Sequence, residues 1–203
     1  MNGQQTFLAN LVCTRISHDL GGNIGAITAA LELAGDNGNC VLDTDTQNIL
    51  TSAAETLKIR QRFFRLAFGL DSISITPTEL VKLCQDYLNT LGNRSSKLDF
   101  ECNTASANLA KVICLCIMIG AEVCIKGGHI KIHIGGNKLT IDVTSDYKLA
   151  AAKIACYEAL LNGKNDIENA SQFVQLIYLR QMLGNDVPIK LQAAENTCKF
   201  VIG

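Results

Sequence analysis

Two long amphipathic segments joined by a short loop constrain the fold of this chain more than any other feature. The first segment, residues 4–34, repeats apolar residues at steps of three or four, and the second begins near Asp43 or Asp45 and ends at Gly69. The turn cluster at residues 35–39 separates them, so they are expected to form an antiparallel helical hairpin. A lone hairpin cannot bury both apolar stripes, which predicts that two copies pair into a four-helix bundle.

The rest of the chain alternates helix and strand signals. Helix patterns occupy residues 76–92, 105–126, 147–161 and 170–183, and strand patterns occupy residues 97–102, 129–134, 138–144, 187–193 and 197–202. This order predicts a helix layer on a mostly antiparallel sheet. The expected fold class is therefore α+β, with a helical-hairpin domain at residues 1–72 followed by an α/β sandwich domain at residues 73–203.

Composition excludes several classes of protein. The net charge of −1 argues against a nucleic-acid binder, and the longest apolar stretch, Val112–Ile125, contains Glu122 and is too short for a membrane span. The N-terminus lacks the pattern of a cleavable signal. The nine cysteines form no C-x-x-C pair and fall mostly in apolar segments, which favours reduced thiols in the cytoplasm over disulfides or a metal site.

His18 is the most informative single residue of the first segment. It lies roughly 160–240° around the helix axis from the apolar stripe, so it is predicted to face solvent. A neutral imidazole is a competent nucleophile, and the carboxylate of Asp19 could orient the ring or hold its proton. Arg15, one turn earlier on the same side, could offset the charge of a phosphate. A surface histidine without a function remains the alternative interpretation.

The helix face around His18 is unusually rich in glycine. Glycine within a helix costs about 0.5–1 kcal/mol relative to alanine, so these residues need a reason. One reason is a partner that must approach the backbone closely; tight helix packing or a helix break are the alternatives. The predicted docking patch comprises Thr14, Arg15, Gly21, Gly22 and Gly25, with Arg60 and Arg62 from the facing level of the second helix. The two arginines form either a basic rim for an acidic partner or a solvated face.

These residues carry a resemblance to a known family. Residues 17–20 resemble the H box of two-component histidine kinases, and His18–Ile27 resembles the pattern His-Asp-Leu-x-Gly-Pro-x-Gly-Ala-Ile of the alphaproteobacterial histidine phosphotransferase family ChpT. Residues 121–128 and 170–184 also look like this family, so the resemblance covers essentially the whole chain. The family's proline is replaced by Asn23.

The resemblance implies a homodimer in which His18, supported by Asp19, carries a phosphoryl group between aspartates of response-regulator receiver domains. It also implies a degenerate ATPase-like second domain, with Mg²⁺ supplied by the receiver and no cofactor held by this chain. No glycine-rich phosphate loop is visible, so the chain is not expected to bind ATP. The alternatives are a true histidine kinase, a phosphatase-type role, and a non-catalytic dimeric scaffold that inhibits a kinase or response regulator.

Overall fold

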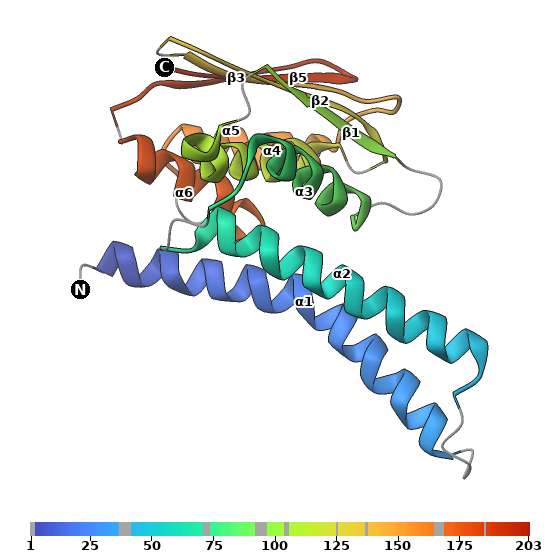
Figure 1. Cartoon of the computed structure of the whole chain (residues 1–203). Coiled ribbons are helices and arrows are strands. Elements are labelled where there is room, and N and C mark those ends of the chain that lie inside the picture. Colours follow the sequence, from blue (N-terminus) through green and yellow to red (C-terminus); the bar gives the residue numbers. More distant parts are fainter. Residues whose placement is uncertain are drawn as a thin grey trace.

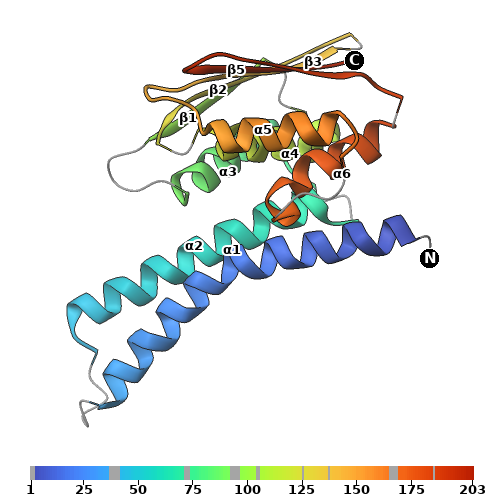
Figure 2. The same ribbon diagram turned by 180° about the vertical axis from the view of Figure 1, so that it is seen from behind.

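The computed structural model describes residues 3–36, 42–70, 74–91, 97–103, 106–124, 126–136, 138–164, 169–184 and 186–203. These residues form three levels, seen edge-on in Figure 1: a helical hairpin, a layer of helices, and a sheet. The view from behind in Figure 2 shows that the helices cover one face of the sheet, the face toward the hairpin. The predicted α+β fold class is confirmed.

The hairpin consists of α1 (Gly3–Asp36) and α2 (Thr44–Phe68), which lie side by side in antiparallel directions. The Asp43 side chain caps α2 by accepting a 2.7 Å hydrogen bond from the Thr46 backbone N–H. At the other end, the Gly69 N–H closes the last turn on the Arg65 carbonyl. Residues 37–39 of the predicted turn cluster lie outside the described residues, and residues 35 and 36 belong to α1.

The second part of the chain follows the predicted order of helices and strands. The five-stranded sheet has the order β1-β2-β3-β5-β4, in which only the pair β1 and β2 is parallel. Helix α3 (Pro77–Asn89) starts with the expected capping box between Thr76 and Glu79. The strands are β1 (Leu98–Cys102), β2 (Gly128–Gly135), β3 (Lys138–Thr144), β4 (Ile189–Ala193) and β5 (Thr197–Ile202).

The core lies between the sheet and α4 (Ala110–Val123), a helix that is almost entirely buried. Alternate residues of the central strands point toward it, and Ile141 of β3 is paired with Ile132 on one side and Phe200 on the other. A Cβ atom at Gly120 would lie 2.8 Å from the Ile130 side chain, so glycine is what allows α4 to approach β2 so closely.

Three helices begin several residues later than the sequence predicts. Helix α4 is preceded by a 3₁₀ turn, η1 (Ala107–Leu109), and α6 (Val174–Leu183) by a second one, η2 (Ala170–Phe173). Helix α5 (Ala151–Leu161) begins four residues later than predicted. The Leu149 N–H donates instead to the Glu195 carbonyl, which holds this segment against the turn between β4 and β5.

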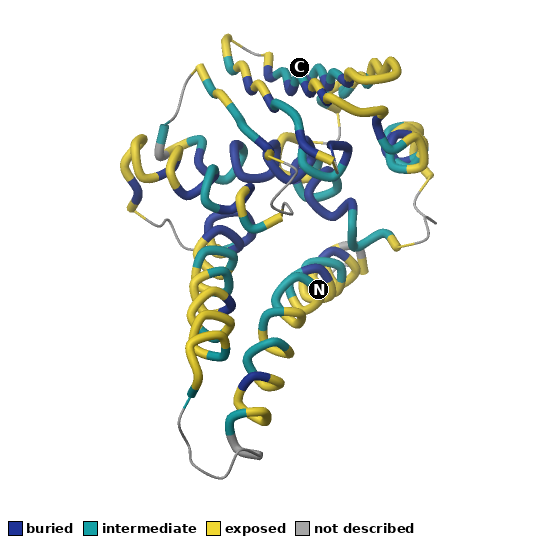
Figure 3. The backbone as a smooth tube through the Cα atoms, turned by 90° about the vertical axis from the view of Figure 1, so that its right-hand side faces the viewer, coloured by how far each residue is buried: buried dark blue, intermediate teal, exposed yellow. Residues whose placement is uncertain are grey.

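Among the described residues, the hairpin packs against the α/β part along the half that contains the start of α1 and the end of α2. There Phe63 of α2 stacks on Tyr87 of α3 with ring centroids 3.7 Å apart, and both residues are fully buried. The hydrophobic core runs without a break from this contact into the α/β layers. The distal half of the hairpin is largely exposed (Figure 3). The division into domains at residue 72 stays a prediction.

Replacing Phe63 with Ala is expected to lower the free energy of unfolding by about 3–5 kcal/mol, because it leaves a cavity at this junction. Urea unfolding followed by circular dichroism measures the loss. Phe7→Ala is the matched control, since Phe7 is 46% exposed on α1. Equal midpoints for the two variants would mean that the stacked pair does not hold the hairpin to the α/β part.

Two further observations concern the helices and the cysteines. Within the described ranges, no helix is long and apolar enough to cross a membrane. No disulfide joins the cysteines that the structure describes, and burial raises the pKa of the Cys116 thiol well above its ordinary value.

Candidate functional site

His18 projects from the middle of α1 with 81% of its side chain exposed. Its Nδ1 atom lies 3.0 Å from Oδ1 of Asp19, which suits a hydrogen bond from a protonated Nδ1 to the carboxylate. Among the described residues, none forms a hydrogen bond with Nε2. The site therefore presents one imidazole nitrogen to solvent while a carboxylate holds the other.

Asp19 is itself held by a buried arginine. Its second carboxylate oxygen, Oδ2, accepts a 2.6 Å hydrogen bond from Nε of Arg15, one helical turn earlier. Arg15 is only 7% exposed, and its Nη1 donates to Oε1 of Glu122 at 2.9 Å and to the Gln172 carbonyl at 3.1 Å. Burial alone would lower the pKa of this guanidinium, but Tyr87 and the carboxylates of Asp19 and Glu122 raise it above its ordinary value.

The network continues into the α/β part. Glu122, on α4, also accepts a 2.6 Å hydrogen bond from Nζ of Lys153 on α5, and Lys153 in turn contacts the side-chain oxygen of Gln172 in η2. We refer to Arg15, Asp19, Glu122, Lys153 and Gln172 together as the Arg15 clamp. It joins the His18 helix to three elements of the helix layer.

A second arginine supports the same residue from the other helix of the hairpin. Nη1 of Arg60 donates to the Asp19 backbone carbonyl at 2.6 Å, while its Nε and Nη2 bond to the side chain and carbonyl of Thr90 at the end of α3. The prediction that Arg60 lies level with His18 is confirmed. Arg60 therefore has a structural role, because it ties α1, α2 and α3 together.

The glycine-rich face is exposed and unbroken. Thr14, Gly21, Gly22 and Gly25 all lie on the surface of α1 beside His18, and α1 remains a continuous helix through them. A Cβ atom built on any of the three glycines meets no other atom within 4 Å. Neither a helix break nor close packing within the chain explains these glycines.

Two predicted members of the docking patch lie elsewhere. The prediction that Arg15 shares the exposed face was wrong. Its side chain is buried against the helix layer, where it donates hydrogen bonds to Glu122 and to the Gln172 carbonyl. Arg62 is half exposed and lies 4.0 Å from a carboxylate oxygen of Glu79 at the start of α3, and no contact in the described structure joins it to His18 or Asp19.

Glu122, Lys153 and Gln172 were not predicted as site residues. The sequence does mark Glu122 as unusual, because it is the single charged residue within the apolar stretch 112–125. A buried carboxylate requires a partner, so a lone charge in a buried helix points to an ion pair. The identity of that partner depends on how the hairpin docks, which local sequence does not specify.

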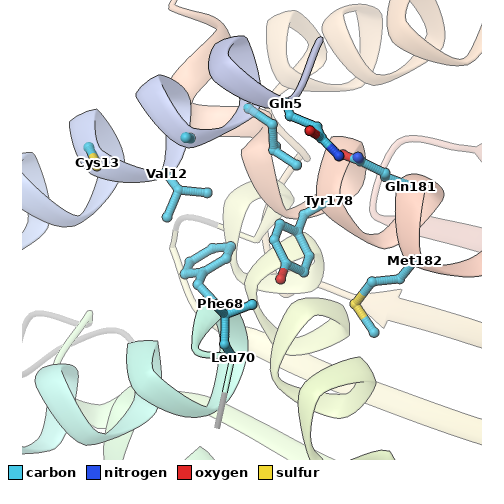
Figure 4. A pocket seen from close by; sticks show the side chains of 10 residues that line it. Gln5, Val12, Cys13, Phe68, Leu70, Tyr178, Gln181 and Met182 are labelled. Carbon is cyan, nitrogen blue, oxygen red and sulfur yellow. The ribbon is translucent and has the colours of Figure 1, made fainter. Parts of the chain in front are cut away.

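An apolar groove follows the same hairpin on another face of α1. One part, of about 460 Å³, lies between the start of α1 and α6 and is lined by Leu8, Val12, Phe68, Tyr178 and Met182 (Figure 4). A second part shares Val12 and Phe68 and continues past Ile16 to Leu20. His18 does not line either part, which separates this groove from the histidine site. Within the described ranges, no cluster of three or more metal-ligating side chains occurs.

The chain thus combines an exposed, carboxylate-oriented histidine on a helical hairpin with an α/β sandwich behind it. A solved bacterial phosphotransferase superposes with a TM-score of 0.74 at 22% identity, covering 98% of this chain and 96% of that one. This match confirms the fold class, including the α/β sandwich after the hairpin.

By sequence, the chain resembles the ChpT family. The protein phosphotransferase ChpT of Brucella abortus (strain 2308) is 27% identical over 137 residues, which span 64% of this chain and 62% of that protein. The match thus covers less than two thirds of the Brucella protein. No family model matches the chain. The likeness confirms the resemblance to ChpT that residues 17–27 indicated.

Proposed function

We propose that this protein is a phosphorelay histidine phosphotransferase, in which His18 carries a phosphoryl group between receiver-domain aspartates. The observation that carries the proposal is the geometry of His18: Nε2 faces solvent, and Nδ1 is 3.0 Å from a carboxylate. The likeness to a protein phosphotransferase supports the same class of activity.

The chemistry needs no proton to leave the histidine. With the proton on Nδ1, the lone pair of Nε2 attacks the phosphorus of an aspartyl phosphate. The N–P bond forms as the P–O bond to the receiver's carboxylate breaks, and that carboxylate leaves with the electron pair. Asp19 stabilises the positive charge that develops on the ring and keeps the Nδ1 proton in the product. The reverse sequence delivers the group to a second receiver, and we expect the receiver to bring Mg²⁺.

We infer that the cavity beside the Arg15 clamp is not a nucleotide site. A cavity of about 260 Å³ between α1 and the α/β part is lined by Glu122, Lys153, Tyr87 and Met118, together with Arg15. Both cations are already paired with Glu122, and the lining offers no glycine loop whose N–H groups could cradle phosphates. We therefore propose that transfer proceeds without ATP, which distinguishes this protein from a histidine kinase.

We propose that the receiver domain docks on the exposed face formed by Thr14, Gly21, Gly22 and Gly25, with Arg60 at the edge of this face.

The docking face is tested with the triple variant Gly21→Ala, Gly22→Ala, Gly25→Ala. Because the glycines face open space, we expect it to be about 2–3 kcal/mol more stable. We expect receiver affinity to fall about tenfold, since added methyl groups hold the receiver away from the backbone. Thermal unfolding and calorimetric titration measure the two effects; unchanged affinity would remove the glycines from the docking surface.

We propose that the protein is a homodimer through the hairpin. The apolar residues Ile24 and Leu31 of α1 are 52% and 54% exposed, and Ile49 of α2 is 48% exposed. This apolar surface continues into the groove at Ile16 and Leu20, so a second hairpin could cover both. We expect the double variant Ile24→Glu, Leu31→Glu to sediment as a monomer in analytical ultracentrifugation. A wild-type protein that sediments as a monomer at micromolar concentration would contradict the dimer.

The test of the function is a transfer assay without nucleotide. A receiver domain phosphorylated on its aspartate is mixed with this protein, Mg²⁺ and a second receiver. We expect label to move to this protein and then to the second receiver. Binding of receivers without any label on this protein would instead support the scaffold, and labelling from ATP alone would support a kinase. In the cytoplasm, where we place the protein, both receivers would be soluble partners.

A further inference from the structure

We infer that the Arg15 clamp lets the α/β part set the reactive form of His18, and that Arg15 and Glu122 are positioning residues for phosphotransfer. This inference rests on the proposed function and deepens it. It starts from the position of Asp19, whose two carboxylate oxygens have different partners: Oδ1 meets Nδ1 of His18, and Oδ2 meets Nε of Arg15.

The tautomer of His18 decides whether it can react. Only an imidazole with its proton on Nδ1 presents a lone pair at the exposed Nε2. An unrestrained neutral imidazole populates both tautomers, so the carboxylate must be held where it accepts from Nδ1. The side chain of Asp19 is only 12% exposed, and the 2.6 Å bond from Arg15 limits its rotation.

Arg15 cannot perform this task from α1 alone. A long side chain on a surface helix is mobile, and immobilising it requires further partners. Those partners are Oε1 of Glu122 and the Gln172 carbonyl, both in the α/β part. Lys153 then holds the second oxygen of Glu122, so the anchor is itself fixed. The chain of contacts makes the orientation of His18 depend on how the hairpin docks on the helix layer.

The charges along the clamp alternate. Asp19 and Glu122 are acidic, and Arg15 and Lys153 are basic, so each of these buried or half-buried groups has a neighbour of opposite charge. Removing Glu122 would leave two cations without their shared partner, and Arg15 would keep only the Gln172 carbonyl as an anchor in the α/β part. Tyr87 lies close enough to affect the Arg15 guanidinium, and its hydroxyl is buried without a partner among the described residues.

The test measures the tautomer of His18 directly. In full-length protein with ¹⁵N-labelled histidine, the two ring-nitrogen shifts report which nitrogen carries the proton, and the His18→Gln spectrum assigns the signals. We expect the Nδ1–H form in the wild type. In Glu122→Ala and Arg15→Met, the tautomer population of His18 should shift toward the Nε2–H form. Phosphoryl transfer should slow about tenfold, as when a residue that orients a functional side chain is lost.

Two further variants distinguish a positioning role of the Arg15 clamp from a purely structural one. Glu122→Gln retains the shape of the side chain and an acceptor for Arg15, so it should fold and show a smaller shift than Glu122→Ala. Glu101→Gln removes an exposed carboxylate of β1 that pairs with Lys131, and it should change neither tautomer nor rate. A merely structural role of the clamp would lower thermal stability but leave the tautomer unchanged.

The outcomes separate this inference from the proposed function. If folded Glu122→Ala and Glu122→Gln both keep the wild-type tautomer and rate, the clamp is not a positioning device, although phosphotransfer stands. If the tautomer shifts in the variants but the wild type never accepts phosphate, the clamp stands and the proposed function fails.

Discussion

We expect the His18→Gln variant to accept no phosphoryl group from a phosphorylated receiver domain. The glutamine amide nitrogen has no available lone pair, so no N–P bond can form. Because His18 is 81% exposed, the substitution should change the free energy of unfolding by less than about 0.5 kcal/mol. Loss of label would therefore report loss of the nucleophile and not loss of the fold.

The matched control is His129→Gln. His129 lies on β2, with its side chain 45% exposed and 3.8 Å from a carboxylate oxygen of Glu101, so it shares the residue type without the hairpin context. We expect it to accept phosphate at the wild-type rate. Label that persists on His18→Gln would contradict the assignment of His18.

The second large effect is expected from Asp19→Asn. The asparagine amide can donate to Nδ1, which would stabilise the tautomer protonated at Nε2 and block the attack. We expect transfer to slow about 100-fold, the lower end of the range for a positioned proton-holding group. Quench-flow measurement of label transfer gives the rate, and calorimetry shows whether the receiver still binds.

Asp45→Asn is the control for this variant. Asp45 lies in the first turn of α2 and is exposed, so its loss should leave the transfer rate unchanged. An Asp19→Asn protein that transfers at the wild-type rate would mean that the 3.0 Å contact with His18 has no part in the chemistry.

Local sequence signals predicted most of the fold. The capping residues Asp43 and Thr76, the terminating Gly69 and the alternation in β2 and β3 act within a few residues of the backbone they organise. Such short-range effects are visible in one sequence. The exact start of α5 was missed because its N-terminal segment pairs with the turn before β5, more than 40 residues away.

The candidate site could be predicted only in part, because some of its contacts join segments that are far apart in the sequence. The exposure of His18 follows from its angle relative to the apolar stripe of α1, a property of a single helix. The burial of Arg15 does not, because it depends on which face of the hairpin the helix layer covers. The stripe itself is exposed at Ile24 and Leu31 in the single chain, which the predicted dimer would explain.

Mapping the phosphorylated residue tests most directly whether His18 carries the phosphoryl group. Wild-type protein is incubated with a phosphorylated receiver and Mg²⁺ in the absence of nucleotide, and the label is mapped by mass spectrometry and by its stability to acid and base. We expect an acid-labile, base-stable phosphate on His18, bonded at Nε2. A phosphate on another residue, or none on a protein that still binds the receiver, would contradict it.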